Sequence, residues 1–312
     1  MRTLVVGAGA IGGYFGGRLL EAKQDATFLV RPRRAAELAA SGLVIRSVNG
    51  DVTIPNPPVI LAEDLHTTFD VILLGCKAYD LDGAMASLAP AVGEKTLIIP
   101  VLNGMKHMDA LDQRFGASHV LGGLCMISST LEPGGIIAHQ NNLDILVFGA
   151  RDAALTPRVE AIVAEFGKAH FKPKRSENIL HAMWEKWVFI AACAGITCLM
   201  RANVGDVVTS GGVEIAVAML DECGAIATAN GFPPSPESSK QNHHWLTNPK
   251  STIMASMLRD VERHAPTEAD HMIGDLLRRG EEKGIASPML RLAYAHLNAY
   301  TARREREAAA GK

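Results

Sequence analysis

The sequence predicts an α/β domain over residues 1–175 followed by an all-helical domain over residues 176–312. A short apolar strand at the N-terminus runs into a glycine-rich turn, and strands and helices then alternate as far as Pro173. From Asn178 onward only helix-spaced apolar residues follow. A chain of 312 residues also suits two cores better than one. The basic segment Pro173–Ser176 is the expected connection between the domains.

The N-terminal turn carries the strongest functional signal. The apolar strand Thr3–Val6 leads into a G-x-G-x-x-G motif that opens a helix and consists of Gly7, Ala8, Gly9, Ala10, Ile11 and Gly12. In this pattern Gly7 permits the tight turn, Gly9 lets the backbone approach a pyrophosphate, and Gly12 lets the helix pack on the strand. The helix N-terminus attracts the phosphates. We therefore predict a Rossmann dinucleotide-binding domain whose cofactor contacts these six residues; a purely structural glycine turn is the alternative.

The end of the second strand indicates which dinucleotide binds. Ala26–Val30 is followed by Arg31, with Arg33 and Arg34 close behind and no acidic residue at the strand end. NAD sites usually place an acid here for the ribose 2′-hydroxyl, whereas an arginine suits the 2′-phosphate of NADP. We favour NADP(H), contacted by Arg31, over a solvated basic turn.

Two polar residues come directly after predicted buried strands. The apolar runs at 70–76 and 96–101 predict parallel strands, and they are followed by Lys77 and Asn103. Ligands of open α/β sheets lie outside the carboxyl ends of the strands, on the side of the glycine motif. Lys77 and Asn103 are therefore candidate site residues, although each taken alone is better explained as a surface lysine or a loop asparagine.

The remaining elements are predicted from periodicity and turn residues. Leu43–Ile45 and Val52–Ile54 flank Asn49-Gly50 and predict a β-hairpin. His119–Met126 predicts a strand, and Ile136–His139 with Leu143–Phe148 predicts an antiparallel pair. Helices are expected near 81–89, 156–168, 178–199, 213–230, 251–263, 267–283 and 288–303.

Composition excludes several classes of protein. The net charge of −2 gives no electrostatic case for binding nucleic acid or a membrane surface. The five scattered cysteines form no C-x-x-C pair, which indicates reduced thiols and a cytoplasmic protein. No signal peptide or membrane-spanning stretch is expected. No metal site is predicted either, because the adjacent His243 and His244 would point apart on a helix or a strand.

Lys186 is the candidate for the proton transfer that a nicotinamide enzyme needs at the substrate oxygen. It lies between Trp184 and Trp187 on the first helix of the second domain. A lysine from which aromatic rings exclude water gives up a proton more readily near neutral pH than a solvated one. The alternative is a lysine whose stem covers the tryptophans while its ammonium group stays in water, and spacing alone favours that alternative.

Taken together, the motifs resemble those of the ketopantoate reductase (2-dehydropantoate 2-reductase) family over nearly the whole chain. The matching pieces are the glycine motif with Gly13, Cys76-Lys77, Asn103-Gly104-Met105, Trp184-Glu185-Lys186, Ser256-Met257-Leu258-Arg259-Asp260 and Thr267-Glu268. The spacing of Ser256 and Glu268 is also that of the family.

The resemblance implies NADPH-dependent reduction of a 2-keto acid to a 2-hydroxy acid, as in the step from ketopantoate to pantoate in pantothenate biosynthesis. Lys186 matches the general acid, Ser256 matches a serine that binds the substrate carboxylate, and Glu268 matches a glutamate near the nicotinamide ribose and the substrate. Arg31 matches the 2′-phosphate contact, and Lys77 and Asn103 match residues at the nicotinamide end. The resemblance also makes a homodimer plausible.

The sequence departs from the family where the substrate's polar groups would bind. Asparagines common in the family are replaced by Ile190, Ala194 and Ile253, a fourth by Val204, and a glutamine by Leu102. A pocket without polar partners discriminates against the 4-hydroxyl of ketopantoate. One interpretation is therefore a 2-hydroxyacid dehydrogenase for a bulkier, more apolar 2-keto acid. Another is that Asn203, Asn242 or His243 replaces the missing amides, with Asn203 as the substrate contact. A third hypothesis, a non-catalytic NADP(H) sensor, would not need Lys186, Ser256 and Glu268 together.

Overall fold

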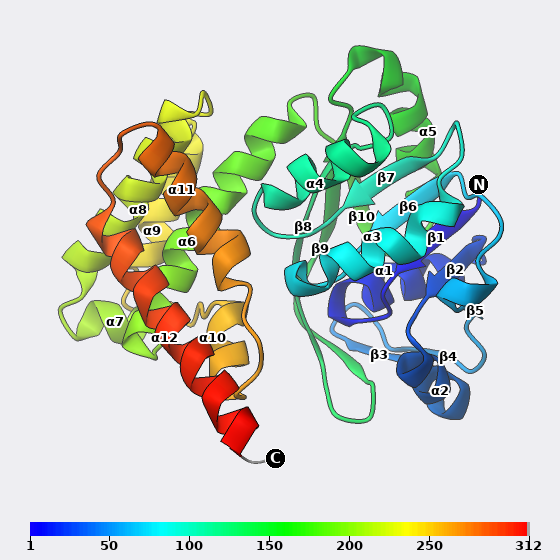
Figure 1. The fold of residues 1–312 in the computed structure, drawn as a ribbon, viewed down its shortest axis with the longest axis horizontal. Coiled ribbons are helices and arrows are strands. Elements are labelled where there is room, and N and C mark those ends of the chain that lie inside the picture. The colour runs from blue at the N-terminus through cyan, green and yellow to red at the C-terminus, as the bar shows by residue number, and fades with distance from the viewer. Residues whose placement is uncertain (311–312) are drawn as a thin grey trace. The chain divides into compact units, whose positions relative to one another are not determined.

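The protein, seen here as a computed structural model that describes residues 1–310, divides into two compact units (Figure 1). The first contains Met1–Leu102 and His107–Leu180, and the second contains Asn103–Lys106 together with the chain from His181. The α/β unit followed by a helical unit confirms the predicted fold class. The units divide after Leu180 rather than at 175, and the segment Asn103–Lys106, which follows a strand of the first unit, groups with the helices.

A five-stranded parallel sheet forms the centre of the α/β unit. Its strand order is β5-β2-β1-β6-β7, with bounds β5 Val59–Ile60, β2 Ala26–Leu29, β1 Thr3–Val6, β6 Val71–Leu74 and β7 Leu97–Pro100. β1 lies in the middle, and later strands add to both sides of it, so the strand order reverses between β1 and β6. Such a reversal opens a crevice beyond the carboxyl ends of the strands, where α/β proteins bind ligands.

A second, mixed sheet contains the hairpin predicted around Asn49-Gly50. It is formed by β10 Lys172–Arg175, β9 Ile137–Gly149, β3 Leu43–Ser47 and β4 Val52–Ile54, and β8 Gly122–Leu131 pairs with β9. The antiparallel pair predicted at 136–148 is wrong, because that stretch is the single strand β9 and its antiparallel partner is β8. The polar run at 140–142 suggests a turn, but Asn141 Oδ1 instead accepts hydrogen bonds from the Ser128 and Leu143 amides beside a register shift in β8.

The basic connection predicted at Pro173–Ser176 is also different in the structure. Lys172–Arg175 is the strand β10, which pairs in parallel with β9. β10 is the last strand of its sheet. A proline is tolerated on such an edge, because only one side of the strand has to donate to a neighbour.

Helix α1 (Ala10–Glu21) packs between the two sheets. A Cβ at Gly16 would lie 2.5 Å from the Phe28 ring of β2, and one at Gly17 would lie 2.6 Å from Ile45 of β3. Two helix glycines thus allow both sheets to approach α1. The other helices of the unit are α2 Pro32–Ser41, α3 Leu81–Leu88, α4 Lys106–Phe115 and α5 Thr156–Phe166, with short 3₁₀ turns at Ala62–Asp64, Ala78–Asp80, Ala89–Ala91 and Ala153–Leu155.

The second unit consists of helices, of which α9, α11 and α12 pack against α8. Their bounds are α6 Ile179–Met200, α7 Val204–Thr209, α8 Val213–Ala229, α9 Pro236–Thr247, α10 Ser256–Glu262, η5 Asp270–Gly274, α11 Asp275–Glu282 and α12 Pro288–Ala310. α12 packs along α8 and η5 (Figure 1). The helix predicted over 251–263 begins only at Ser256, and the one predicted over 267–283 starts with η5, a π-helical turn.

Helix α6 is long and apolar enough to cross a membrane by length and composition, with a mean hydropathy of 1.3. However, 67% of its most apolar window is buried inside the structure, and core helices of globular proteins meet the same criterion. None of the five cysteines, all of which lie in the described part of the chain, forms a disulfide. Burial raises the pKa of the Cys193 and Cys198 thiols to about 12, which keeps them protonated and unreactive.

Candidate active site

The glycine turn has the geometry that a bound pyrophosphate requires. Gly7 has a φ of +90°, and a Cβ at Gly12 would collide with the carbonyl of Gly7. The Cβ position of Gly9, by contrast, has no heavy atom within 4 Å, so the backbone is open to a ligand there. Gly9 is also the N-cap of α1 and offers no side chain to the first helical N–H groups. These features fit a dinucleotide, whose phosphate oxygens would accept hydrogen bonds from those N–H groups.

The segment after β6 packs against this turn. Val6 of β1 pairs with Leu74 of β6, and a Cβ at Gly75 would lie 3.1 Å from the Gly12 amide nitrogen. Lys77 follows as the residue that starts the 3₁₀ turn Ala78–Asp80, and it is half-buried. The sequence prediction that Lys77 belongs to the neighbourhood of the glycine turn thus agrees with the strand pairing.

Arg31 is the N-cap residue of α2 and lies two residues after the end of β2. Its side chain is 72% exposed, and its Nη2 lies 2.6 Å from Asp80 Oδ1. The guanidinium is therefore available to solvent on one side and paired with a carboxylate on the other. Because a 2′-phosphate and the Asp80 carboxylate are both anions, they would compete for this group.

Arg34 is a residue that the sequence reasoning noted but did not select. Its Nε donates to the Ala8 carbonyl at 3.0 Å, and its Nη2 donates to the Gly135 carbonyl at 3.1 Å. The side chain is 13% exposed and also pairs with Glu37. Arg34 thus ties the glycine turn to the β8–β9 connection. Its place five residues after the end of β2 gives no signal for this role, since Gly135 is distant in sequence.

Lys186 and Asn103 meet in the helical unit although they are distant in sequence. Lys186 Nζ donates a hydrogen bond to Asn103 Oδ1 at 3.0 Å, and both side chains are half-buried. Asn103 lies in the short segment that groups with the helices, and the next residue, Gly104, has a φ of +81°. A Cβ at Gly104 would lie 3.1 Å from the His271 carbonyl oxygen, so a glycine lets the segment approach η5.

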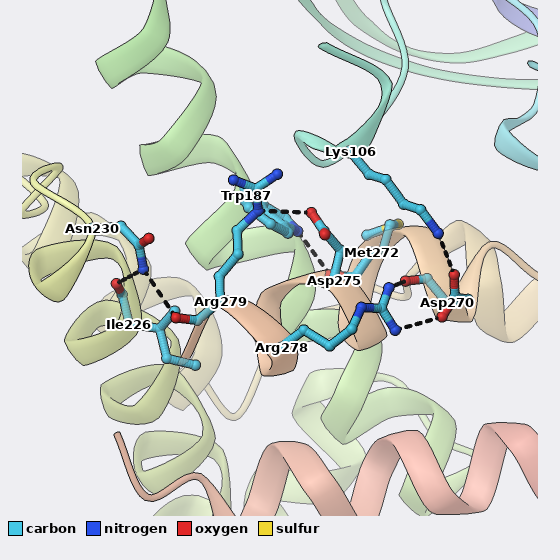
Figure 2. A network of polar contacts seen from close by, with 9 residues as sticks. All are labelled: Lys106, Trp187, Ile226, Asn230, Asp270, Met272, Asp275, Arg278 and Arg279. Atoms are coloured by element: carbon cyan, nitrogen blue, oxygen red, sulfur yellow. Dashed lines mark hydrogen bonds and ion pairs between the residues drawn. The ribbon is translucent and has the colours of Figure 1, made fainter. Parts of the chain in front are cut away.

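The tryptophans beside Lys186 are core residues. Trp184 and Trp187 are 2% and 0% exposed, and Trp184 stacks on Phe232 at a ring distance of 5.3 Å. Trp187 Nε1 donates to the Met272 carbonyl at 2.8 Å (Figure 2). Lys186 is therefore carried by a stretch of α6 whose neighbouring side chains are fixed on both sides.

Glu268 precedes η5 and is 9% exposed. Its charge opposes the effect of burial on the nearby His271, whose pKa nevertheless lies below the ordinary value because desolvation is the larger influence. Ser256 is the exposed first residue of α10. Both residues lie in the unit that holds Lys186 and Asn103.

The Asn203 side chain caps the N-terminus of helix α7. It is the N-cap of α7: its Oδ1 accepts from the Asp206 amide at 2.9 Å, and its Nδ2 donates to Asp206 Oδ2 at 2.6 Å. Capping of this kind explains an asparagine at this position without a substrate. The substrate-binding role predicted for Asn203 competes with this function.

Three positions that lack the family's amides, Ile190, Ala194 and Ile253, are buried or half-buried. Ile190 and Ala194 follow Lys186 by one and two helical turns on α6, and Ala194 is 1% exposed whereas Ile190 is half-buried. Ile253 is half-buried, and its carbonyl accepts from the Val204 amide at 3.0 Å. Ile190 lies one helical turn from Lys186, on the same face of α6.

Among residues 1–310, no group of three or more histidine, cysteine, aspartate or glutamate side chains could hold a metal ion. His243 and His244 lie on helix α9, and His243 Nε2 lies 3.5 Å from Asp221 Oδ1.

Comparisons with known proteins agree with the fold and the motifs. The profile of ketopantoate reductase PanE/ApbA matches residues 3–153, and that of its C-terminal domain matches residues 178–301. An uncharacterized oxidoreductase of Bacillus subtilis, YkpB, is 36% identical, over 97% of this chain and 99% of its own length. A 2-dehydropantoate 2-reductase of Geobacter metallireducens has a similar structure, with a TM-score of 0.86, 27% identity and coverage of 96% of this chain and 99% of that one. A D-mandelate dehydrogenase shares the fold, with a TM-score of 0.88 at 19% identity over 98% of this chain and all of the other.

Proposed function

Because the chain belongs to the ketopantoate reductase family, a family of oxidoreductases, we propose that it reduces a 2-keto acid to the 2-hydroxy acid with NADPH. The observation that carries this proposal is the hydrogen bond from Lys186 Nζ to Asn103 Oδ1. It joins Lys186, which the sequence put forward for the proton transfer, to Asn103, which the sequence selected as a candidate site residue.

Lys186 acts as the proton donor in this proposal. An ammonium group has three N–H donors, and the one given to Asn103 leaves two for the substrate. As hydride reaches the carbonyl carbon, negative charge develops on the carbonyl oxygen, which the ammonium stabilises and then protonates. Asn103 orients the ammonium group by accepting a hydrogen bond from it.

The glycine turn and the residues around it hold the cofactor. NADPH supplies the hydride when it is bound. The open backbone at Gly9 and the first turn of α1 receive the pyrophosphate, and Arg31 receives the 2′-phosphate in place of Asp80. The family resemblance makes Lys77 and Glu268 further candidate contacts of the cofactor. Ser256 offers a hydroxyl to the substrate carboxylate.

We further propose that the preferred substrate is more apolar than ketopantoate. The family's asparagine four residues after the catalytic lysine would offer an amide to a substrate hydroxyl, whereas Ile190 offers only a hydrocarbon surface. A buried hydroxyl without a partner costs free energy, so a site of this kind selects against it. Asn203 does not offset this loss while its amide caps α7.

A panel of 2-keto acids tests both parts of the proposal. NADPH oxidation is measured with ketopantoate and with branched and aromatic 2-keto acids, for the wild type and for Ile190→Asn. We expect the highest kcat/KM with an apolar side chain, and a shift toward ketopantoate in the variant. Preferred turnover of ketopantoate by the wild type would contradict the apolar-substrate proposal. Tight binding of NADPH without turnover of any member would contradict the reductase proposal and favour a nucleotide-binding sensor.

A further inference from the structure

The π-helical turn η5 contacts the segment that carries Asn103. Asp270 Oδ2 accepts a hydrogen bond from Lys106 Nζ at 2.8 Å (Figure 2). The next residue, His271, lies against Gly104, whose Cβ position is 3.1 Å from the His271 carbonyl oxygen and 3.2 Å from its ring. Two successive residues of η5 therefore hold the two ends of the short stretch after Asn103.

The same turn also holds the stretch of α6 that carries Lys186. The Met272 carbonyl accepts from the buried indole Nε1 of Trp187 at 2.8 Å. The Arg279 guanidinium lies 5.9 Å from the centre of a Trp187 ring and is itself paired with Asp275 at 3.0 Å (Figure 2). The two partners of the Lys186–Asn103 hydrogen bond are thus attached, through their chain neighbours, to one turn of helix.

Asp270, which accepts the hydrogen bond from Lys106, is itself held in place by other residues. Its carboxylate also accepts from Arg278 Nη1 and from the Tyr294 hydroxyl, both at 2.8 Å. Partial burial alone would raise the pKa of Asp270, but the hydrogen bonds from Arg278, Lys106 and Tyr294 hold that pKa well below its ordinary value. The carboxylate is therefore ionised, and its position is defined by α11 and α12.

We propose that η5 positions the Lys186–Asn103 pair, and that Lys106 and Asp270 are positioning residues for the proton transfer; this inference rests on the proposed function. π-Helical turns are rare and occur frequently at functional sites, because the extra residue changes which side chains face a neighbour. A displacement of about 1 Å in a catalytic group costs up to about 100-fold in rate. Removal of one of the contacts that hold the Asn103 segment is a smaller disturbance, and we expect it to lower kcat by about 10-fold.

The ion pair between Lys106 and Asp270 adds little to the stability of the fold. Its two side chains are 49% and 52% exposed, and exposed pairs of this kind contribute little to folding. The pair can therefore be broken with the fold intact, and an effect on the reaction is separable from an effect on stability.

The test uses Lys106→Met, which removes the ion pair, and Lys106→Arg, which can restore it. Arg291→Met is the matched control, because Arg291 forms another exposed ion pair of the helical unit, with Glu281 at 2.6 Å. Amide hydrogen exchange of the peptide containing Asn103 is measured on the nucleotide-free proteins. Thermal unfolding, the Kd for NADPH, and kcat and KM for a 2-keto acid that the wild type reduces are measured in parallel.

We expect faster exchange at 103–106 and a kcat lowered about 10-fold in Lys106→Met, with the Kd for NADPH and the melting temperature unchanged. Lys106→Arg should recover most of both losses, and Arg291→Met should resemble the wild type. Unchanged exchange in Lys106→Met would overturn the inference, as would faster exchange with an unchanged kcat. A wild type that reduces no 2-keto acid would refute the proposed function, and the exchange measurement would still show whether Lys106 holds the segment.

Discussion

Replacement of Asp80 is predicted to tighten the binding of NADPH without affecting the binding of NADH. Arg31 Nη2 lies 2.6 Å from Asp80 Oδ1, and the two side chains are 72% and 32% exposed. A 2′-phosphate has to displace this carboxylate from the guanidinium before it can be bound. In Asp80→Asn the competing negative charge is gone, whereas the size of the side chain is kept.

The magnitude follows from the exposure of the pair. Ion pairs with solvent access contribute about 0–1 kcal/mol, so removal of the competitor returns at most about 1 kcal/mol to the phosphate contact. At about 1.4 kcal/mol per factor of ten, this corresponds to a Kd for NADPH lowered about two- to five-fold.

The assay is a titration of each variant with NADPH and with NADH, followed by nucleotide fluorescence or calorimetry. Asp82→Asn is the matched control, because it removes the same charge two residues away from an exposed position of α3. Arg31→Met should weaken NADPH binding and leave NADH binding unchanged. An unchanged Kd for NADPH in Asp80→Asn, or an equal gain for NADH, would refute the assignment of Arg31 to the 2′-phosphate.

Three further predictions concern the glycine turn, the α7 cap and the carboxylate of η5. Gly12→Ala places a Cβ against the Gly7 carbonyl and 3.3 Å from Val5 Cγ1, so we expect a loss of about 1–3 kcal/mol in denaturant unfolding together with loss of NADPH binding. A variant that still binds NADPH like the wild type would contradict the proposed pyrophosphate site. Asn203→Ala removes the N-cap of α7 and should cost about 1 kcal/mol in unfolding free energy with KM unchanged; a raised KM with unchanged stability would instead place Asn203 in the substrate site. The pKa of Asp270 is lower in the folded protein than the value of about 3.9 expected in the unfolded chain, so its stabilising effect is complete above that value and is lost as the pH falls toward the folded pKa. The difference in unfolding free energy between wild type and Asp270→Asn should therefore be constant above about pH 5 and shrink below about pH 4, and a difference that persists in acid would disprove this.

The parts of the fold that follow from short-range patterns were predictable from the sequence. The parallel strands β1, β2, β6 and β7 are buried apolar runs, and each was located to within a few residues. β9 resembles a hairpin in the sequence because the residues at 140–142 are polar. Its pairing with β8 on both sides of this stretch, with the Ser128 amide donating to Asn141 Oδ1, shows that it is one strand.

Two of the helices that the sequence analysis did not predict, α2 and α9, bury few residues. α2 has one buried side chain, Leu38, and α9 has two, Asn242 and Leu246, so neither shows a clear apolar stripe. The Pro at the start of each helix was the available signal.

The candidate residues could be selected from the sequence, but the contacts between them could not. Lys186 and Asn103 were selected for separate reasons, and only the fold shows the hydrogen bond between them. The roles inferred for Lys106 and Asp270 also depend on contacts between distant parts of the sequence, which no local motif reports.

The central claim is that Lys186 donates the proton in the reduction of a 2-keto acid. The most direct test compares kcat for Lys186→Ala with kcat for Lys240→Ala on the best 2-keto acid substrate. Lys240 serves as the control because it is an exposed lysine on α9. The Kd for NADPH is measured on both proteins. We predict a loss of at least about 100-fold in Lys186→Ala only, with NADPH binding retained, because general acid catalysis contributes about 100- to 10,000-fold. A Lys186→Ala enzyme that reduces the substrate at a rate near that of the wild type would contradict the account.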